Sequence, residues 1–154
     1  MRWLLVPLLL GLFQTTPAAW AQSLGNWEIE CRPDRPLKTD NCSLAHHSTQ
    51  EDDIALVMFS YVDRELSLLI SGDRVFTQAE INIDENLIFF TLLCGEGYCF
   101  FSGSVAEKLA RHFSRGRSAV IEIATSSFGV DLTQRVDLSG FGSAFAEFRN
   151  GRPK

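Results

Sequence analysis

The sequence predicts a mostly β domain, an antiparallel sandwich or barrel with one amphipathic helix and a short C-terminal helix. Three observations support this fold class. Many short segments alternate apolar and polar residues, and turn-forming residues separate them about every 8–12 positions. One later segment changes to a helical period. We expect that helix, at about residues 105–115, to plug an end of the sheet structure or to cover one face.

The first expected strand lies at residues 27–31, within the N-terminal third of the chain. Residues 27–31 alternate apolar and polar side chains, which is the period of a half-buried strand. Residues 54–62 and 66–71 flank a charged turn, and this arrangement predicts a hairpin. The other expected strands are 42–50, 79–83, 87–94, 98–101, 119–123 and 130–138.

The last expected strand carries a polar residue on its apolar side. Gln134 shares that side with Val136 and Leu138. An unpaired buried amide costs about 1–3 kcal/mol, so we expect Gln134 to find a hydrogen-bond partner.

Two helices are expected after the middle strands. Ser104 and Glu107 have the spacing of a capping box at the start of the first helix. Gly116 supplies its expected end. The apolar stripe of this helix is formed by Val105, Ala106, Leu109, Ala110 and Phe113. A second, short helix is expected at 143–149.

The first 21 residues have the pattern of an export signal. Arg2 gives a positive start, residues 3–13 are almost entirely apolar, and Ala19-Trp20-Ala21 is a small-x-small site. Because the apolar run is well short of the roughly 20 residues of a spanning helix, we expect cleavage after Ala21 rather than a membrane anchor. The remaining domain, 22–154, is then expected in the periplasm, secreted or at the cell envelope, without a transmembrane segment.

Four cysteines, Cys31, Cys42, Cys94 and Cys99, follow this signal. An even number in an exported chain predicts disulfides. Three pairings are possible, and we favour Cys31–Cys42 and Cys94–Cys99 because each pair is close in sequence and brackets turn-forming residues. A redox role is disfavoured because four residues, rather than two, separate Cys94 from Cys99. Zinc is disfavoured because only one of the two gaps has the usual spacing.

The overall composition narrows the class of function. Without Arg2 the chain has 13 basic and 19 acidic residues, a formal net charge of −6. This balance argues against a broadly basic nucleic-acid binder, and the ordinary apolar content argues against a disordered chain.

Several landmarks occur together in a specific order. They are Trp27-Glu-Ile-Glu-Cys31 with Cys42, then Cys94-Gly-Glu-Gly-Tyr-Cys99, an amphipathic helix, and Val136-Asp-Leu-Ser-Gly-Phe141 before a small-residue helix. From Trp27 to about Phe148 the chain resembles the invasion-associated locus B family of exported alphaproteobacterial proteins. That family usually has Lys where Ser139 stands, and a Pro-Leu-Gly-like turn that residues 69–73 lack, so the chain resembles a divergent member.

The resemblance implies a periplasmic or envelope-associated protein whose family is linked by name to host-cell invasion. It implies no catalytic residues and no cofactor. Only the four cysteines carry over, as disulfide bridges.

The sequence also contains no convincing catalytic set. No serine lies in a Gly-x-Ser-x-Gly elbow, and the cysteines are expected to be oxidised. His46 and His47, with Asp52 and Asp53 nearby, are the best metal candidates. Because adjacent strand residues face opposite ways, we expect one half-buried and one exposed histidine rather than a metal site. The distant His112 cannot be placed beside them.

Four cationic or titratable residues share the side of the first helix opposite its apolar stripe: Lys108, Arg111, His112 and Arg115. One interpretation is a docking face for an anionic partner such as lipid phosphates, lipopolysaccharide or an acidic protein. The favoured interpretation is a solvated face whose late cations suit the helix dipole.

Phenylalanine is frequent, with eleven residues after Phe13. Seven gather near the second cysteine loop and the chain end: Phe89, Phe90, Phe100, Phe101, Phe141, Phe145 and Phe148. One sheet face cannot hide two successive phenylalanines. A partner is therefore one candidate to cover the second face.

Together these features favour a non-enzymatic envelope protein that binds another protein, from the envelope or a host, or an anionic surface component. The alternative is a small periplasmic enzyme or small-ligand carrier with a site between sheet and helix. That alternative requires a deep pocket converging on His46 or His112.

Overall fold

The computed structural model describes residues 20–31, 39–47, 54–72, 74–84, 92–125 and 132–150. The first five strands in this part of the chain are β1 (Trp20–Leu24), β2 (Trp27–Cys31), β3 (Thr39–His47), β4 (Ile54–Val62) and β5 (Glu65–Gly72). The others are β6 (Gln78–Ile83), β7 (Leu92–Gly95), β8 (Tyr98–Ser102), β9 (Ser118–Ala124) and β10 (Leu132–Asp137). The helices are α1 (Ser104–Phe113) and α2 (Phe141–Asn150). The predicted mostly β fold class with two helices is confirmed.

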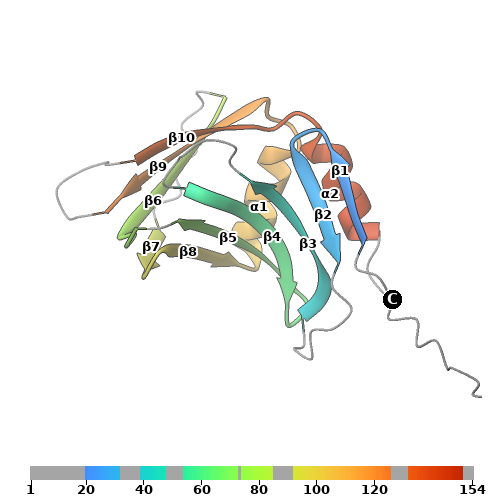
Figure 1. Ribbon diagram of the computed structural model, residues 1–154, viewed down its shortest axis with the longest axis horizontal. Coiled ribbons are helices and arrows are strands. Elements are labelled where there is room, and N and C mark those ends of the chain that lie inside the picture. The colour runs from blue at the N-terminus through green and yellow to red at the C-terminus, as the bar shows by residue number, and fades with distance from the viewer. Residues whose placement is uncertain are drawn as a thin grey trace, which may run out of the picture.

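The ten strands form one sheet in the order β1-β2-β3-β4-β5-β8-β7-β6-β9-β10, and every pairing is antiparallel. The sheet curls, so that β9 and β10 lie above β4 and β5 in the view of Figure 1. Both halves contribute to a single continuous apolar core. The arrangement is therefore sandwich-like, with α1 inside the curve and α2 beside β1 and β2 (Figure 1).

The core side of the sheet is filled by aromatic rings from both helices. Trp27 lies at the centre, with its ring 4.7 Å from Phe141 and 6.2 Å from Phe113. Phe59 on β4 contacts Phe113, Phe141 and Phe145 at ring distances of 5.3–6.0 Å. Such edge-on and stacked pairs stabilise a core beyond the burial of their area. The helices are thus held on the sheet by phenylalanines that face inward.

The two ends of the sheet meet at a pair of glycines. Gly25 and Gly140 both have positive φ, +67° and +81°. A Cβ on Gly140 would lie 2.7 Å from the Leu24 carbonyl oxygen, and one on Gly25 would lie 2.8 Å from that of Ser139. The Trp27 indole N–H donates to the Asp137 carbonyl at 3.2 Å across the same junction. The residues around Trp27 and those around Gly140, far apart in sequence, therefore join the ends of the sheet.

Several sequence expectations about helix ends need correction. Ser104 is already the first helical residue, and Gly103 (φ +62°) is the N-cap without a side-chain hydrogen bond, so the capping box is wrong. Glycine serves here because it adopts this backbone conformation without strain. α1 ends at Phe113, before Gly116, whose lack of a side chain instead admits Ile83 and Leu138. α2 begins at Phe141, two residues earlier than expected.

Most of the strands expected from the sequence are confirmed where the structure describes them. The hairpin of β4 and β5 is present, and so are the strands at 79–83, 98–101 and 119–123 within one residue or so. Gln134 is buried as expected, but its side-chain oxygen finds no hydrogen-bond partner among the described residues, so the prediction fails for this atom. The expected segments 48–50, 87–91 and 130–131 lie outside the described residues, as do residues 1–19 of the expected export signal 1–21. The last two residues of that expected signal, Trp20 and Ala21, lie in β1 and pair with β2. Among the residues that are described, no helix is long and apolar enough to cross a membrane.

Candidate functional site

Successive residues of β8 have opposite environments. Phe101 and Cys99 are 2% and 0% exposed and face the core. Phe100 and Tyr98 are 46% and 49% exposed. Alternation along a strand requires this division, because neighbouring side chains project to opposite sides. The sequence predicted that one face of the sheet cannot hide both Phe100 and Phe101. In the structure Phe100 is the residue on the outer side, and it marks a specific surface there.

The strand register extends this surface across the sheet. Phe100 pairs with Leu69 on β5, and Leu69 pairs with Met58 on β4. In the neighbouring row, Tyr98 pairs with Ser71 on β5, and Ser71 pairs with Leu56 on β4. We call the resulting set the outer apolar face: Ala45, Leu56, Met58, Leu69, Tyr98 and Phe100. Ala45 is buried, the three aliphatic side chains are partly exposed, and the two aromatic side chains are the most exposed.

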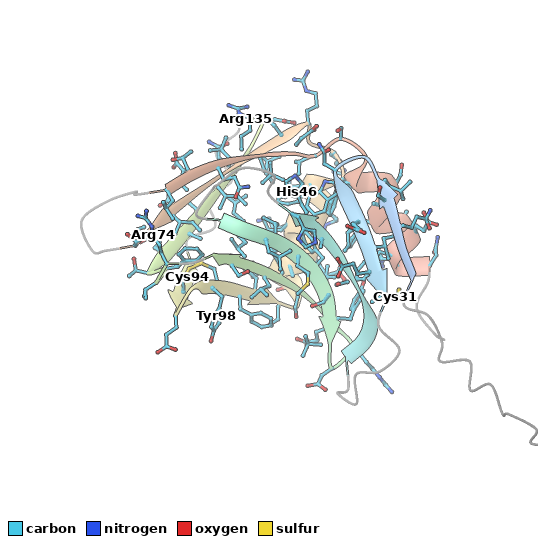
Figure 2. All side chains as sticks on the ribbon, viewed as in Figure 1. Cys31, His46, Arg74, Cys94, Tyr98 and Arg135 are labelled. Atoms are coloured by element: carbon cyan, nitrogen blue, oxygen red, sulfur yellow. A yellow bond between two sulfur atoms is a disulfide. The ribbon has the colours of Figure 1, made fainter. Side chains whose placement is uncertain are left out.

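A polar border lies along one side of this face. Ser43, Ser60, Ser67 and Ser102 pair in a single row across β3, β4, β5 and β8. Ser67 is fully buried, and its hydroxyl has no hydrogen-bond partner within the part of the chain that the structure describes. Figure 2 shows Tyr98 pointing away from β8 at the edge of the molecule, opposite in direction to the core. An apolar centre with a polar rim is the usual composition of a protein-binding surface.

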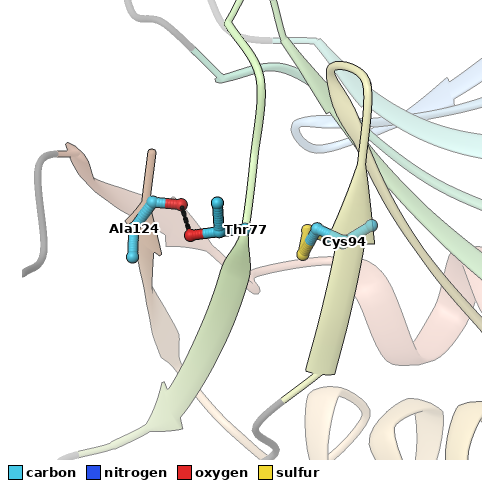
Figure 3. Close-up of a disulfide and its surroundings, with 4 residues drawn as sticks. Thr77, Cys94 and Ala124 are labelled. Carbon is cyan, nitrogen blue, oxygen red and sulfur yellow. Dashed lines mark hydrogen bonds between the residues drawn. A yellow bond between two sulfur atoms is a disulfide. The ribbon is translucent and has the colours of Figure 1, made fainter. Parts of the chain in front are cut away.

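The hairpin that presents Tyr98 is tied to its neighbours. Cys94 and Cys99 are direct partners across β7 and β8 and form a disulfide. The Thr77 carbonyl accepts from the Cys94 amide at 3.3 Å, and the Thr77 hydroxyl donates to the Ala124 carbonyl at 2.9 Å (Figure 3). The bridge and these hydrogen bonds connect the hairpin to β6 and β9. Tyr98 and Phe100 are therefore presented from a fixed backbone.

The second disulfide joins β2 and β3, close to the β1 end of the strand order. Cys31 and Cys42 are partners in register across β2 and β3 and are bonded. Both pairings favoured from the sequence are thus the ones present, and the described part of the chain has no free cysteine.

The expected cationic face is only partly a helix face. Lys108, Arg111 and His112 lie on α1, whereas Arg115 follows the helix end in a turn. The pKa of His112 is lowered, first by burial and then by the charges of Lys108, Arg115 and Arg111. The local field is therefore positive. Because the buried residues of α1 pack on the core, these cations and the outer apolar face lie on different sides of the sheet.

The two adjacent histidines are separated as the strand period predicted. His46 faces the core side, with its ring 5.3 Å from that of Trp27, and burial is the main cause that lowers its pKa. Its Nδ1 is buried, with no hydrogen-bond partner among the residues described. His47 is exposed on the other side and lies 3.4 Å from a Glu30 carboxylate oxygen. His112, among the α1 cations, is not brought together with either, and Asp52 and Asp53 lie outside the described residues.

Sequence reasoning missed the partner of His47. Glu28 and Glu30 of β2 lie beside it on the neighbouring strand. Their two-residue spacing is visible in the sequence, but it is equally typical of any strand with one wet face. Only the pairing of β2 with β3 shows that these side chains meet.

Comparisons with known proteins identify the fold. No family model and no curated protein matches the chain. The crystal structure of invasion associated protein B from Bartonella henselae superposes with a TM-score of 0.62 and 14% sequence identity. The match covers 85% of this chain and 96% of that one. The resemblance seen in the sequence is thereby confirmed at the level of the fold, and the chain has the fold of invasion associated protein B.

Proposed function

We propose that this chain is an exported, envelope-associated protein of the invasion-associated locus B type that acts by binding another protein. The observation that carries the proposal is the outer apolar face, where Tyr98 and Phe100 are about half exposed beside Leu69 and Met58. Export is supported by the signal-like first 21 residues and by two disulfides, which persist in oxidising compartments.

The outer apolar face has properties that suit recognition. Aromatic side chains contribute most of the energy in many protein interfaces, because they bury much area with few rotatable bonds. The backbone under them is fixed by sheet pairing and by the Cys94–Cys99 bridge. A rigid surface loses less conformational entropy on binding than a flexible one.

The alternative of an enzyme or ligand carrier receives less support. It required a deep pocket converging on His46 or His112. The His46 ring instead packs against Trp27 on the core side, and His112 lies among the α1 cations. A binding role for the α1 cations is a second candidate, supported by the positive field around His112.

In-cell photocrosslinking tests the proposal and separates these surfaces. A photoreactive residue is placed at Phe100, at Arg111 on α1, or at the exposed Ala146 on α2 as a matched control. We expect a discrete protein adduct from position 100 and none from position 146. An adduct only from position 111 would assign binding to the cationic face instead. Equal labelling at all three positions, or none at position 100, contradicts the proposal.

A further inference from the structure

A cluster of potential metal ligands borders the outer apolar face, next to Ala45 and Leu56 on the same side of the sheet. It consists of Glu28 and Glu30 on β2 and His47 on β3. One ligand atom from each residue lies within 4.8 Å of the others. We propose that these three side chains bind a divalent transition-metal ion, with Zn²⁺ as the best fit.

The backbone brings the three residues together by strand geometry. Glu28 and Glu30 are two positions apart, so they project to the same side of β2. Glu28 pairs with Ala45, and His47 lies two residues further along β3 on that same side. The Cys31–Cys42 bridge joins the same two strands in register. The strands are thus fixed before any ion binds, and only side-chain rotations are needed.

The distance between His47 and Glu30 fits two ligands of one tetrahedral ion. Their closest atoms, Nε2 and Oε1, are 3.4 Å apart. That exceeds the approximately 2.7–3.2 Å of a good N–H···O bond. Two ligands at about 2.0–2.1 Å from a tetrahedral zinc ion are separated by about 3.4 Å. The observed pair therefore has the separation of a tetrahedral edge, and rotation of the Glu28 side chain can bring in the third ligand.

The donor set and its surroundings also select the ion. One imidazole nitrogen and two carboxylate oxygens suit Zn²⁺, whereas Ca²⁺ takes six or more oxygens. The two carboxylates repel one another, and a dication relieves that repulsion. The His47 side chain is 53% exposed and that of Glu30 29%, so an ion reaches the site from solvent. Three protein ligands leave a fourth position for water or for a group from a partner.

Titration of the oxidised protein with Zn²⁺ by calorimetry tests this site. We expect one ion per chain, and we expect His47→Ala and Glu30→Gln each to weaken binding about tenfold or more. His112→Ala, which removes an imidazole elsewhere, is the matched control and should leave the affinity unchanged. Circular dichroism verifies that each variant is folded.

A spectroscopic readout identifies the ligand directly. In heteronuclear NMR, Zn²⁺ should shift the ring nitrogens of His47 while those of His112 stay in place. An unchanged affinity in His47→Ala, or the absence of binding at micromolar Zn²⁺, would overturn the proposal and leave His47 and Glu30 as a surface ion pair. Because Phe100 is not part of this site, failure here leaves the crosslinking result at that position unaffected.

Discussion

The two sides of β8 show how one strand can serve two purposes. Phe101 faces the core and is 2% exposed, whereas its neighbour Phe100 is 46% exposed on the outer apolar face. The two residues carry the same side chain and are neighbours on the same strand. What differs is what covers each side of the strand. α1 packs on the side of Phe101, whereas Phe100 on the outer apolar face remains about half exposed. The comparison separates stability from recognition within two adjacent residues.

The largest expected effect comes from breaking the core side. Phe101→Ala should lower the free energy of unfolding by about 3–5 kcal/mol, because it leaves a cavity in the closed core. Phe100→Ala should change it by only about 0.5–1 kcal/mol, because its ring is already half in water. Urea denaturation of both variants measures the difference. Equal losses would mean that the outer apolar face is as well packed as the core.

The disulfides are expected to have an intermediate effect. Replacing Cys31 and Cys42 with serine should cost about 3 kcal/mol, and replacing Cys94 and Cys99 about 2 kcal/mol, because the second loop is shorter. The second change also loosens the hairpin that carries Tyr98, so capture of the partner at Phe100 should weaken as well. If the Cys94–Cys99 variant retained full capture, the fixed backbone would not contribute to recognition.

The smallest expected effect concerns charge at the junction of the sheet ends. The pKa of Asp137 is lowered, first by the Ser139 amide and then by the Ser139 hydroxyl, both of which donate to its carboxylate. A depressed folded pKa stabilises the protein above the unfolded value of about 3.9, and this contribution is lost as pH falls through the folded value.

Asp137→Asn should therefore cost less than about 1 kcal/mol at pH 7, since the carboxylate is exposed. The cost should shrink towards pH 3. Thermal melting of this variant and of Ser102→Ala, as an exposed control, across pH 3–7 measures it. A cost that does not change with pH would show that shape, rather than charge, holds this junction.

The sequence itself was enough to predict most of the strands. Alternation in β2, β6 and β9 is strong because one side of each faces a closed core. Short loops that contain turn-forming residues favoured the two cysteine pairs that are found. The start of α1 was predicted less well, because Gly103 offers a cap through its backbone rather than through a side chain.

What the chain alone determined is local: periodicity, turns, bridges and the inward stripe of α1. The tertiary structure decided which side chains from distant segments meet. Register placed Phe100 beside Leu69 and Met58, and it brought His47 to Glu30. Curling of the sheet joined Trp27 to Asp137 and Gly25 to Gly140, giving a structural reason for two of the sequence landmarks. These outcomes depend on pairing between strands, and a period along one strand gives the side of a residue but not its neighbour across the sheet.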